Sequence, residues 1–266
     1  MGDQLGLSGI IITLNEEKNI RDAIDSLFQV CDEVVVVDSC STDRTVELAG
    51  EAGAKVVVQP YLGDGIQKNE PLKYVKNRWV VCMDADERLT PELVEAIKKI
   101  DFENTAYDGF EVRRRNMIGD RWIKSCGWYP DYLVRIYRHD RLRYPDVKAH
   151  AAIPSVNTCR LKADMVHYTY SNTAEMFSKQ INRFSSRSAK IIYAKGKKVG
   201  PFAPVFHGIH TFFLNYIIRG GILGGVDGFS ISLAMGMNSY LKYARVIEWQ
   251  RNPRLTETEE FKKNIW

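Results

Sequence analysis

Short runs of Val and Ile alternate with helical patterns through the first hundred residues of this 266-residue chain. The runs read as buried strands at 8–14, 33–37, 55–58 and 78–83. After the first run, Ile20, Ile24 and Leu27 recur at the three- and four-residue spacing of a helix face. Buried strands joined by helices predict a Rossmann-like α/β fold, in which a mostly parallel sheet carries helices on both faces.

Polar side chains follow the predicted strand ends, which is where open α/β sheets bind their ligands. They are Thr13, Asn15, Glu16, Asp38, Ser39, Asp84 and Asp86. Because parallel strands end at the same edge of a sheet, we expect one cleft to gather these side chains.

Asp84 and Asp86 stand one residue apart where the fourth apolar run ends. Such a carboxylate pair suits Mg²⁺ or Mn²⁺, which keep part of their water shell and are usually completed by the oxygens of a diphosphate. The pair therefore indicates a nucleotide diphosphate substrate. The alternative is a solvated acidic turn before a helix, for which Thr90 is a suitable N-cap and Pro91 a suitable first residue.

Four segments resemble, in order and spacing, the motifs of family 2 glycosyltransferases with the GT-A fold. They are Ile-Ile-Ile-Thr-Leu-Asn-Glu-Glu (10–17), Val-Val-Asp-Ser-Cys-Ser-Thr-Asp-Arg-Thr (36–45), Gln-Lys-Asn (67–69) and Met-Asp-Ala-Asp-Glu (83–87), the last containing the DXD motif. The resemblance implies a UDP-sugar donor whose uracil and ribose are held by Thr13, Asn15, Glu16 and Asp38. It also implies that Asp84 faces the ribose, that Asp86 binds the metal ion on the diphosphate, and that Lys68 lies near the phosphates.

One segment departs from the family pattern. Many relatives carry Asp-Asp-Gly-Ser where this chain has Asp38-Ser-Cys-Ser41. Asp38 still fits its role, whereas the departure weakens a role for Ser39.

The Gly-Trp-Tyr-Pro-Asp segment at 127–131 resembles a branch of the family that includes β-glucosyltransferases of lipopolysaccharide inner-core assembly. The resemblance implies that the acceptor is bound by Trp128, Tyr129 and Arg135. An inverting transfer needs one base within hydrogen-bonding reach of the acceptor hydroxyl, and Asp131 is the candidate by its position in the segment. Alternatively, Asp131 caps a turn before a strand and the two aromatic side chains belong to the core.

Two histidines are further candidates for the site. His150 lies near a Val-His-Glu element of relatives, although this chain has Val147-Lys-Ala-His-Ala-Ala152. His167, in Val-His-Tyr-Thr-Tyr170, resembles a His-x-x-Tyr element that follows the catalytic core. Either His167 contacts metal or phosphate, or it has a structural role among aromatic residues.

Charge is divided unevenly along the chain. Residues 1–100 contain 11 Lys and Arg and 18 Asp and Glu, a net charge of −7, and the remainder, with 26 and 15, has a net charge of +11. A basic second half suits a phosphorylated glycolipid or an anionic membrane surface, although ordinary solvated Lys and Arg would give the same balance. No nucleic-acid-binding motif is present, so nucleic acid is not an expected partner.

The five cysteines are scattered and form no Cys-x-x-Cys pair, which argues for a reducing compartment and against structural zinc. The N-terminal residues show no basic region followed by an apolar core, so no secretory signal is expected. We therefore expect a cytoplasmic protein that is peripheral at the cytoplasmic face of the inner membrane.

The chain changes character near residue 199. Residues 199–218 form an uncharged run, and residues 220–241 are apolar apart from Asp227 and small polar side chains. The prolines and histidines of the first run make it a poor spanning helix, so we expect a segment that lies in the membrane interface. The alternative is a pair of helices that packs on the catalytic domain or forms a homodimer contact.

The predicted organisation is a GT-A catalytic domain with a helical C-terminal segment. The boundaries are 1–198 for the catalytic domain, with a nucleotide-sugar half (1–100) and an acceptor half (101–198), then 199–256 for the helical segment and 257–266 for a charged tail. Residues 60–77, which carry Lys68, are the predicted mobile loop.

The sequence thus predicts a metal-dependent, inverting hexosyltransferase that moves a hexose such as glucose from a UDP-sugar to a lipid-linked saccharide such as the lipopolysaccharide inner core. The alternatives are a polyprenyl-phosphate glycosyltransferase and a non-catalytic nucleotide-sugar-binding protein. A sugar nucleotidyltransferase is disfavoured, because Asn15-Glu-Glu17 stands where that class needs a Gly-rich loop with Arg and Lys.

Overall fold

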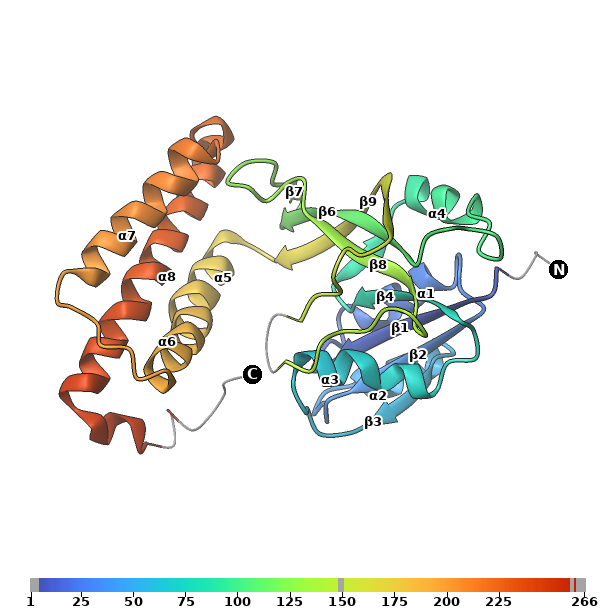
Figure 1. Ribbon diagram of the computed structural model, residues 1–266, viewed down its shortest axis with the longest axis horizontal. Helices are drawn as coiled ribbons and strands as arrows, with labels where there is room; N and C mark the ends of the chain where they lie inside the picture. The colour runs from blue at the N-terminus through green and yellow to red at the C-terminus, as the bar shows by residue number, and fades with distance from the viewer. Residues whose placement is uncertain (1–4, 148–150, 259–260, 262–266) are drawn as a thin grey trace. The chain divides into compact units, whose positions relative to one another are not determined.

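The computed structural model describes residues 5–147, 151–258 and 261, which fall into two compact units (Figure 1). The first unit comprises Met1–Arg115 and Pro130–Tyr168, and the second comprises Asn116–Tyr129 and Thr169–Trp266. The predicted boundary at residue 198 lies inside the second unit, in which the segment 116–129 packs with the C-terminal helices.

The first unit is built on a mixed sheet with the strand order β3-β2-β1-β4-β8-β6-β9-β5. Its strands are β1 (Leu7–Thr13), β2 (Glu33–Asp38), β3 (Lys55–Val58), β4 (Trp79–Asp84), β5 (Glu87–Leu89), β6 (Gly109–Ile118), β8 (Tyr132–Arg138) and β9 (Thr158–Tyr170), the last residues of β6 and β9 belonging to the second unit. β1 pairs in parallel with β2 and β4, and β2 pairs in parallel with β3. β8 is antiparallel to β4 and β6, so the four parallel strands that the Val and Ile runs predict are extended by antiparallel ones.

Helical segments cover both faces of this sheet (Figure 1). They are α1 (Ile20–Leu27), α2 (Thr45–Glu51), α3 (Asp64–Asn69), the 3-10 helix η1 (Glu70–Lys73) and α4 (Pro91–Lys98). Because side chains alternate along a strand, Ile11 and Val81 pack with α1, α2 and α4. Ile10 and Val80 pack on the other face, with η1 and with Leu142, Tyr144 and Ile153.

Two local predictions have opposite outcomes. The Thr90 hydroxyl caps α4 by accepting a hydrogen bond from the N–H of Leu93 at 3.2 Å, as the sequence predicts. Residues 60–77, predicted to be a loop, contain α3 and η1 instead, so that prediction was wrong. Gly65 of α3 packs closely on another segment, because an added Cβ would lie 1.8 Å from the carbonyl oxygen of Pro145. The missing side chain permits this contact between two segments.

The second unit is mostly helical. Its elements are β7 (Arg121–Trp122), α5 (Thr173–Ser178), the π-helix η2 (Lys179–Phe184), α6 (Ser185–Ala194), α7 (Ala203–Phe213), the π-helix η3 (Leu214–Ile218), the 3-10 helix η4 (Gly221–Gly224), α8 (Gly225–Arg251) and the 3-10 helix η5 (Pro253–Thr256). Ile123 and Cys126 share a core with Met176, Ile231 and Ala234. The segment 116–129 is therefore held by helices that lie far away in the sequence.

Among the described residues, no single helix has both the length and the apolar composition needed to cross a membrane. The segments Ala203–Ile218 and Gly221–Arg251 meet that requirement only when taken together, and they are bent by 70° relative to each other.

Candidate active site

The ends of the parallel strands bring the predicted donor-site residues together. The strand register places Thr13 opposite Asp38 and Ile12 opposite Asp84. Thr13 and Asp38 are buried, whereas 29% of the Asp84 side chain is exposed. This edge of the sheet is therefore the candidate site of the first unit.

Asp38 closes the turn that follows β2. Its Oδ1 accepts a hydrogen bond from the N–H of Ser41 at 2.7 Å, and its Oδ2 accepts one from the Ser41 hydroxyl. Cys40 adopts a φ of 66°, the left-handed region that glycine enters most readily. The turn thus keeps the backbone conformation that the family's glycine would supply, although the residue differs.

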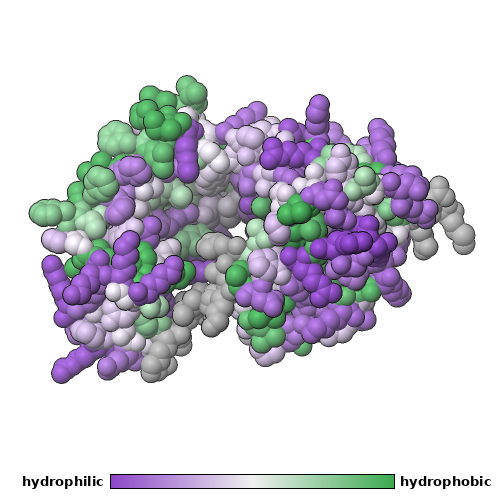
Figure 2. Space-filling view, viewed as in Figure 1, coloured by the Kyte–Doolittle hydropathy of each residue, from purple (hydrophilic) through white to green (hydrophobic). Residues whose placement is uncertain are grey.

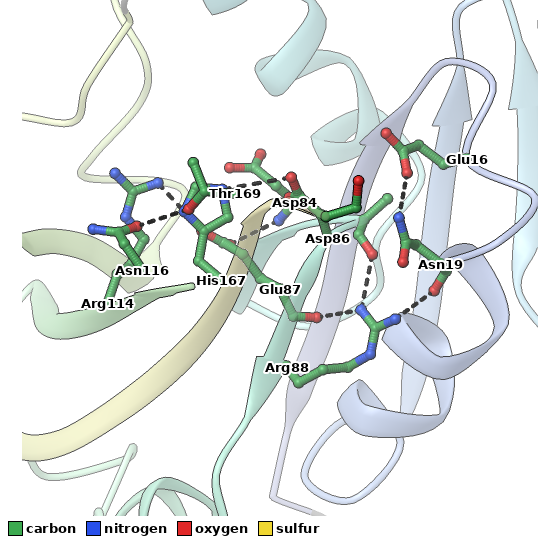
Figure 3. A network of polar contacts seen from close by, with 12 residues as sticks. Glu16, Asn19, Asp84, Asp86, Glu87, Arg88, Arg114, Asn116, His167 and Thr169 are labelled. Carbon is green, nitrogen blue, oxygen red and sulfur yellow. Dashed lines mark hydrogen bonds and ion pairs between the residues drawn. The ribbon is translucent and has the colours of Figure 1, made fainter. Parts of the chain in front are cut away.

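Asn15 and Glu16 connect the loop after β1 to the loop after β2. The Asn15 side-chain oxygen accepts a hydrogen bond from the N–H of Thr42 at 2.8 Å, and the N–H of Asn15 donates to the Ser41 hydroxyl at 2.7 Å. The Glu16 carboxylate accepts a hydrogen bond from the side chain of Asn19 at 2.7 Å (Figure 3). These contacts fix the two loops beside Thr13 and Asp38.

Two cations hold the carboxylate of Asp84. An Arg135 nitrogen donates to it at 2.8 Å, and the Lys68 Nζ lies 3.7 Å from it. Burial alone would raise the pKa of Asp84, but the charges of Lys68 and Arg135 outweigh it, and the pKa lies well below its usual value. Asp84 is therefore ionised, and Lys68 lies where the family resemblance expects a basic residue.

Glu87 is a buried member of this network that the sequence analysis missed. Its side chain has no exposed surface; Oε1 accepts a hydrogen bond from Arg135, and Oε2 accepts one from the N–H of Asp84 at 2.9 Å. Burial lowers the pKa of Arg135, but Glu87 and Asp84 raise it well above its usual value. The only signal in the sequence was the last residue of Met-Asp-Ala-Asp-Glu. Arg135 itself is only 2% exposed, and its role toward an acceptor stays a prediction.

Asp86 and His167 face each other at the turn between β4 and β5 (Figure 3). β5 pairs with β9 so that Glu87 lies opposite His167, and this pairing places the His167 Nε2 3.5 Å from the Asp86 Oδ2. The Arg88 guanidinium fixes the turn by donating to three carbonyl groups, those of Ala85, Glu87 and Asn19. Both side chains are partly exposed. Such exposure is needed if they are to bind a metal ion that also contacts a substrate.

The ligand atoms of Asp86 and His167 suit a divalent cation whose remaining coordination positions are filled by a substrate. A carboxylate oxygen and an imidazole nitrogen are both acceptable ligands for Mn²⁺, and Mg²⁺ is commonly held by one or two carboxylates together with phosphate oxygens. Within the described ranges, no group of three or more His, Cys, Asp and Glu side chains could hold a metal ion by itself. An ion at Asp86 and His167 would therefore take its remaining ligands from substrate and water.

Asp131 precedes β8 and forms an ion pair with Arg114 of β6. The Arg114 Nε lies 2.9 Å and its Nη2 lies 2.6 Å from the Asp131 Oδ2. The same guanidinium approaches the Glu87 Oε1 at 3.4 Å, which joins the candidate base to the network around Asp84. Since 30% of the Asp131 side chain is exposed, it is accessible to a second substrate.

The predicted acceptor-binding aromatic residues belong to the second unit. The Trp128 ring lies 6.1 Å from the ring of Tyr170, and the Tyr129 ring meets Trp122 edge-on at 5.0 Å. Both side chains are partly exposed, and their contact with an acceptor stays a prediction. His150 lies outside the described residues.

A cavity of about 190 Å³ adjoins the charge network of the first unit. Lys68 and Arg135 line it together with Tyr144 and residues 151–153. The two cations that hold Asp84 therefore border open space.

The fold and the site define an α/β enzyme domain of the GT-A type, in which acidic and basic side chains meet at parallel strand ends. A sequence profile described as glycosyl transferase family 2 matches residues 8–165. The chain belongs to this family, and the match supports glycosyl transfer as its activity. The predicted α/β fold with a helical C-terminal segment is confirmed.

Relatives of the chain match over most of their length. An uncharacterised glycosyltransferase of Rickettsia typhi is 33% identical over 262 residues, covering 91% of this chain and 87% of the relative. The lipopolysaccharide core biosynthesis glycosyltransferase LpsC of Rhizobium meliloti is 28% identical, covering 92% and 93%. Among solved structures, residues 1–349 of S. aureus TarS match with 17% identity and a TM-score of 0.47, covering 88% of this chain and 90% of that one.

Proposed function

We propose that the protein is a metal-dependent, inverting glycosyltransferase that moves a hexose, such as glucose, from a UDP-sugar to a lipid-linked saccharide, such as the inner core of lipopolysaccharide. The observation that carries this proposal is the facing pair Asp86 and His167 beside the ionised Asp84, on strands whose neighbours present Thr13 and Asp38. The relative LpsC, named for lipopolysaccharide core biosynthesis, supports the class of acceptor.

The donor would bind across the ends of β1, β2 and β4. The Thr13 hydroxyl is buried and has no hydrogen-bond partner in the described part of the chain, and buried polar groups are normally satisfied. A uracil or ribose group beside Asp38 would satisfy it. Asp86 and His167 would hold Mg²⁺ or Mn²⁺, which supplies charge neutralisation at the leaving diphosphate.

Asp131 would act as the base on the acceptor side. It would accept the proton of the acceptor hydroxyl while that oxygen attacks the anomeric carbon from the side opposite the departing diphosphate. The two hydrogen bonds from Arg114 to the Asp131 Oδ2 fix the orientation of this carboxylate.

Thermal unfolding with nucleotides tests the donor site. We expect UDP and one UDP-sugar to raise the melting temperature in the presence of Mn²⁺, because a ligand at 100 times its Kd stabilises the folded state by about 2.7 kcal/mol. ADP and GDP serve as controls, and His167→Ala should reduce the part of the shift that depends on metal. No shift with UDP at concentrations well above millimolar would refute a nucleotide site at these strand ends.

Substitution of Asp131 tests the base. Asp131→Asn is expected to keep the donor-induced thermal shift and to lower the transfer rate by about 10²- to 10⁴-fold, the range that general bases contribute. Asp140→Asn is the matched control, because Asp140 also pairs with an arginine, Arg78, through a 2.8 Å contact. Transfer at the normal rate by the Asp131 variant would remove this residue from the mechanism.

A further inference from the structure

A large apolar surface covers the α7–α8 helix pair of the second unit. We define the apolar face as the exposed large apolar side chains between Phe202 and Tyr240, among them Ile209, Leu223 and Val226. It holds 14 of the 24 exposed large apolar side chains of the described residues. Figure 2 shows hydrophobic surface gathered over α7 and over the turn into α8. Monomeric soluble proteins rarely expose a contiguous apolar surface of this kind, so the face requires a partner.

Small residues make the closest contacts within this helix pair, beside aromatic contacts such as that of Phe212 with Phe229 at 5.8 Å. Gly208 of α7 packs so closely on α8 that an added Cβ would lie 3.1 Å from the Cβ of Tyr240. A Cβ on Gly228 would lie 1.8 Å from the carbonyl oxygen of Gly221, and Ser232 is fully buried. Helices that pack in water place their large apolar residues inside. Close helix contacts at small residues, with many large apolar side chains on the outer surface, are typical of helices packed in lipid.

The charged side chains of this region are compatible with a lipid surface. Residues 199–241 contain only two Asp, Glu, Lys or Arg side chains, Arg219 and Asp227. Arg121 donates to Asp227 at 2.8 and 3.0 Å and neutralises it. The exposed Arg219, at the turn between the helices, is left as a cation that can contact lipid phosphates.

Three of the four most exposed side chains of the apolar face lie at the turn between the helices, and the fourth is Phe202. Leu223 is 88% exposed, Val226 is 82% exposed and Ile218 is 77% exposed. Because the two helical segments are bent by 70°, these side chains form the projecting end of the pair instead of one straight span. A fluid hydrocarbon layer can accommodate such a projection without a shaped pocket.

We propose that the apolar face binds an anionic phospholipid bilayer and inserts the turn at Ile218, Leu223 and Val226 into one leaflet. Arg219, which follows Ile218 directly in the sequence, then lies at the level of the lipid phosphates. This interaction goes beyond glycosyl transfer and needs neither donor nor acceptor.

The membrane contact also has a consequence for the acceptor, and this consequence rests on the proposed function. The segment 121–128 packs on the same turn: an added Cβ on Gly224 would lie 2.2 Å from the Ser125 Oγ, and the Cys126 thiol lies 3.4 Å from the carbonyl oxygen of Gly228. Trp128, predicted to bind the acceptor, ends this segment. Trp128 would therefore contact a lipid-linked saccharide at the membrane surface.

Vesicle sedimentation with the full chain tests the proposal. We expect the protein to sediment with vesicles of phosphatidylcholine and phosphatidylglycerol, and more weakly with phosphatidylcholine alone. The double variant Leu223→Glu/Val226→Glu is expected to bind at least about tenfold more weakly, because two carboxylates would enter hydrocarbon. Val156→Glu is the matched control, since Val156 is 61% exposed in the first unit.

Unchanged circular dichroism and melting of the double variant would show that it folds. The proposal is overturned if the wild-type protein stays in solution with every vesicle, or if the folded double variant binds as the wild type does. Equal binding to vesicles with and without phosphatidylglycerol would overturn the proposed preference for anionic lipid. If the wild-type protein does not bind vesicles but dimerises, and the double variant does not dimerise, the apolar face is instead a contact with a second copy of the chain. UDP-induced stabilisation is measured without lipid, so failure of the donor site would be seen separately.

Discussion

Asp86→Ala is expected to lower metal-dependent transfer by about 10³-fold or more, because the loss of a metal ion's charge stabilisation amounts to several kcal/mol of the barrier. Asp86 lies 3.5 Å from His167, and in the described part of the chain no larger cluster of ligand side chains could replace the pair. The measurement is the initial rate of transfer across a Mn²⁺ titration, together with the thermal shift by UDP and Mn²⁺.

Asp25→Ala is the matched control for this substitution, because Asp25 is an exposed carboxylate on α1 of the same unit. Its rate should equal that of the wild type. If Asp86→Ala retained full turnover with an unchanged Mn²⁺ dependence, the metal site would have to be placed elsewhere.

Arg135→Met is expected to lower the free energy of unfolding by about 3–5 kcal/mol, the usual cost of removing one partner from a buried ion pair. Glu87 has no exposed surface, and Arg135 is its hydrogen-bond partner, so the substitution leaves a buried carboxylate whose other cation, Arg114, is 3.4 Å away. Asp84 loses its 2.8 Å contact in the same variant. The measurement is denaturant-induced unfolding monitored by circular dichroism.

Two further variants show whether the effect comes from the buried pair. Arg78→Met removes the exposed arginine that pairs with Asp140, and it should change stability far less. Adding Glu87→Gln to Arg135→Met removes the uncompensated charge and should restore part of the loss. A loss below about 1 kcal/mol for Arg135→Met would mean that Glu87 is satisfied without Arg135.

The parallel part of the fold could be predicted because its sequence signals are local. Val34 to Val37 form a continuous apolar run, and both faces of that strand are buried, as the run implies. The order of the antiparallel strands could not be predicted, since β8 inserts between β4 and β6 through pairings that no local pattern specifies. Gly65 shows the same limit at one residue: glycine favours a loop locally, but here it permits contact with Pro145, 80 residues later in the sequence.

The residues of the candidate site also fall into those that a local sequence pattern reveals and those that depend on distant contacts. Asp84 and Asp86 could be found because they lie together after one strand. The opposition of Asp86 and His167 depends on the pairing of β5 with β9, and the family resemblance alone indicated His167. Glu87 was indicated only by its place after the two aspartates. Arg88 and Arg114 act through contacts with distant residues, such as the 2.9 Å hydrogen bond from Arg88 to the carbonyl of Asn19, so no spacing in the sequence could reveal them.

The packing of the segment 116–129 on α8 sets an order of events during synthesis. Cys126 and Ser232, whose side chains lie 3.6 Å apart, are separated by 106 residues. At a ribosomal rate of about 5–20 residues per second, the segment is made roughly 5–20 s before its partner. β1 to β4, which carry the donor-site strand ends, are already complete by then. An unfinished chain that stops before α8 therefore leaves Ile123 and Cys126 without their core, and we expect it to aggregate, although its parallel strands can already pair.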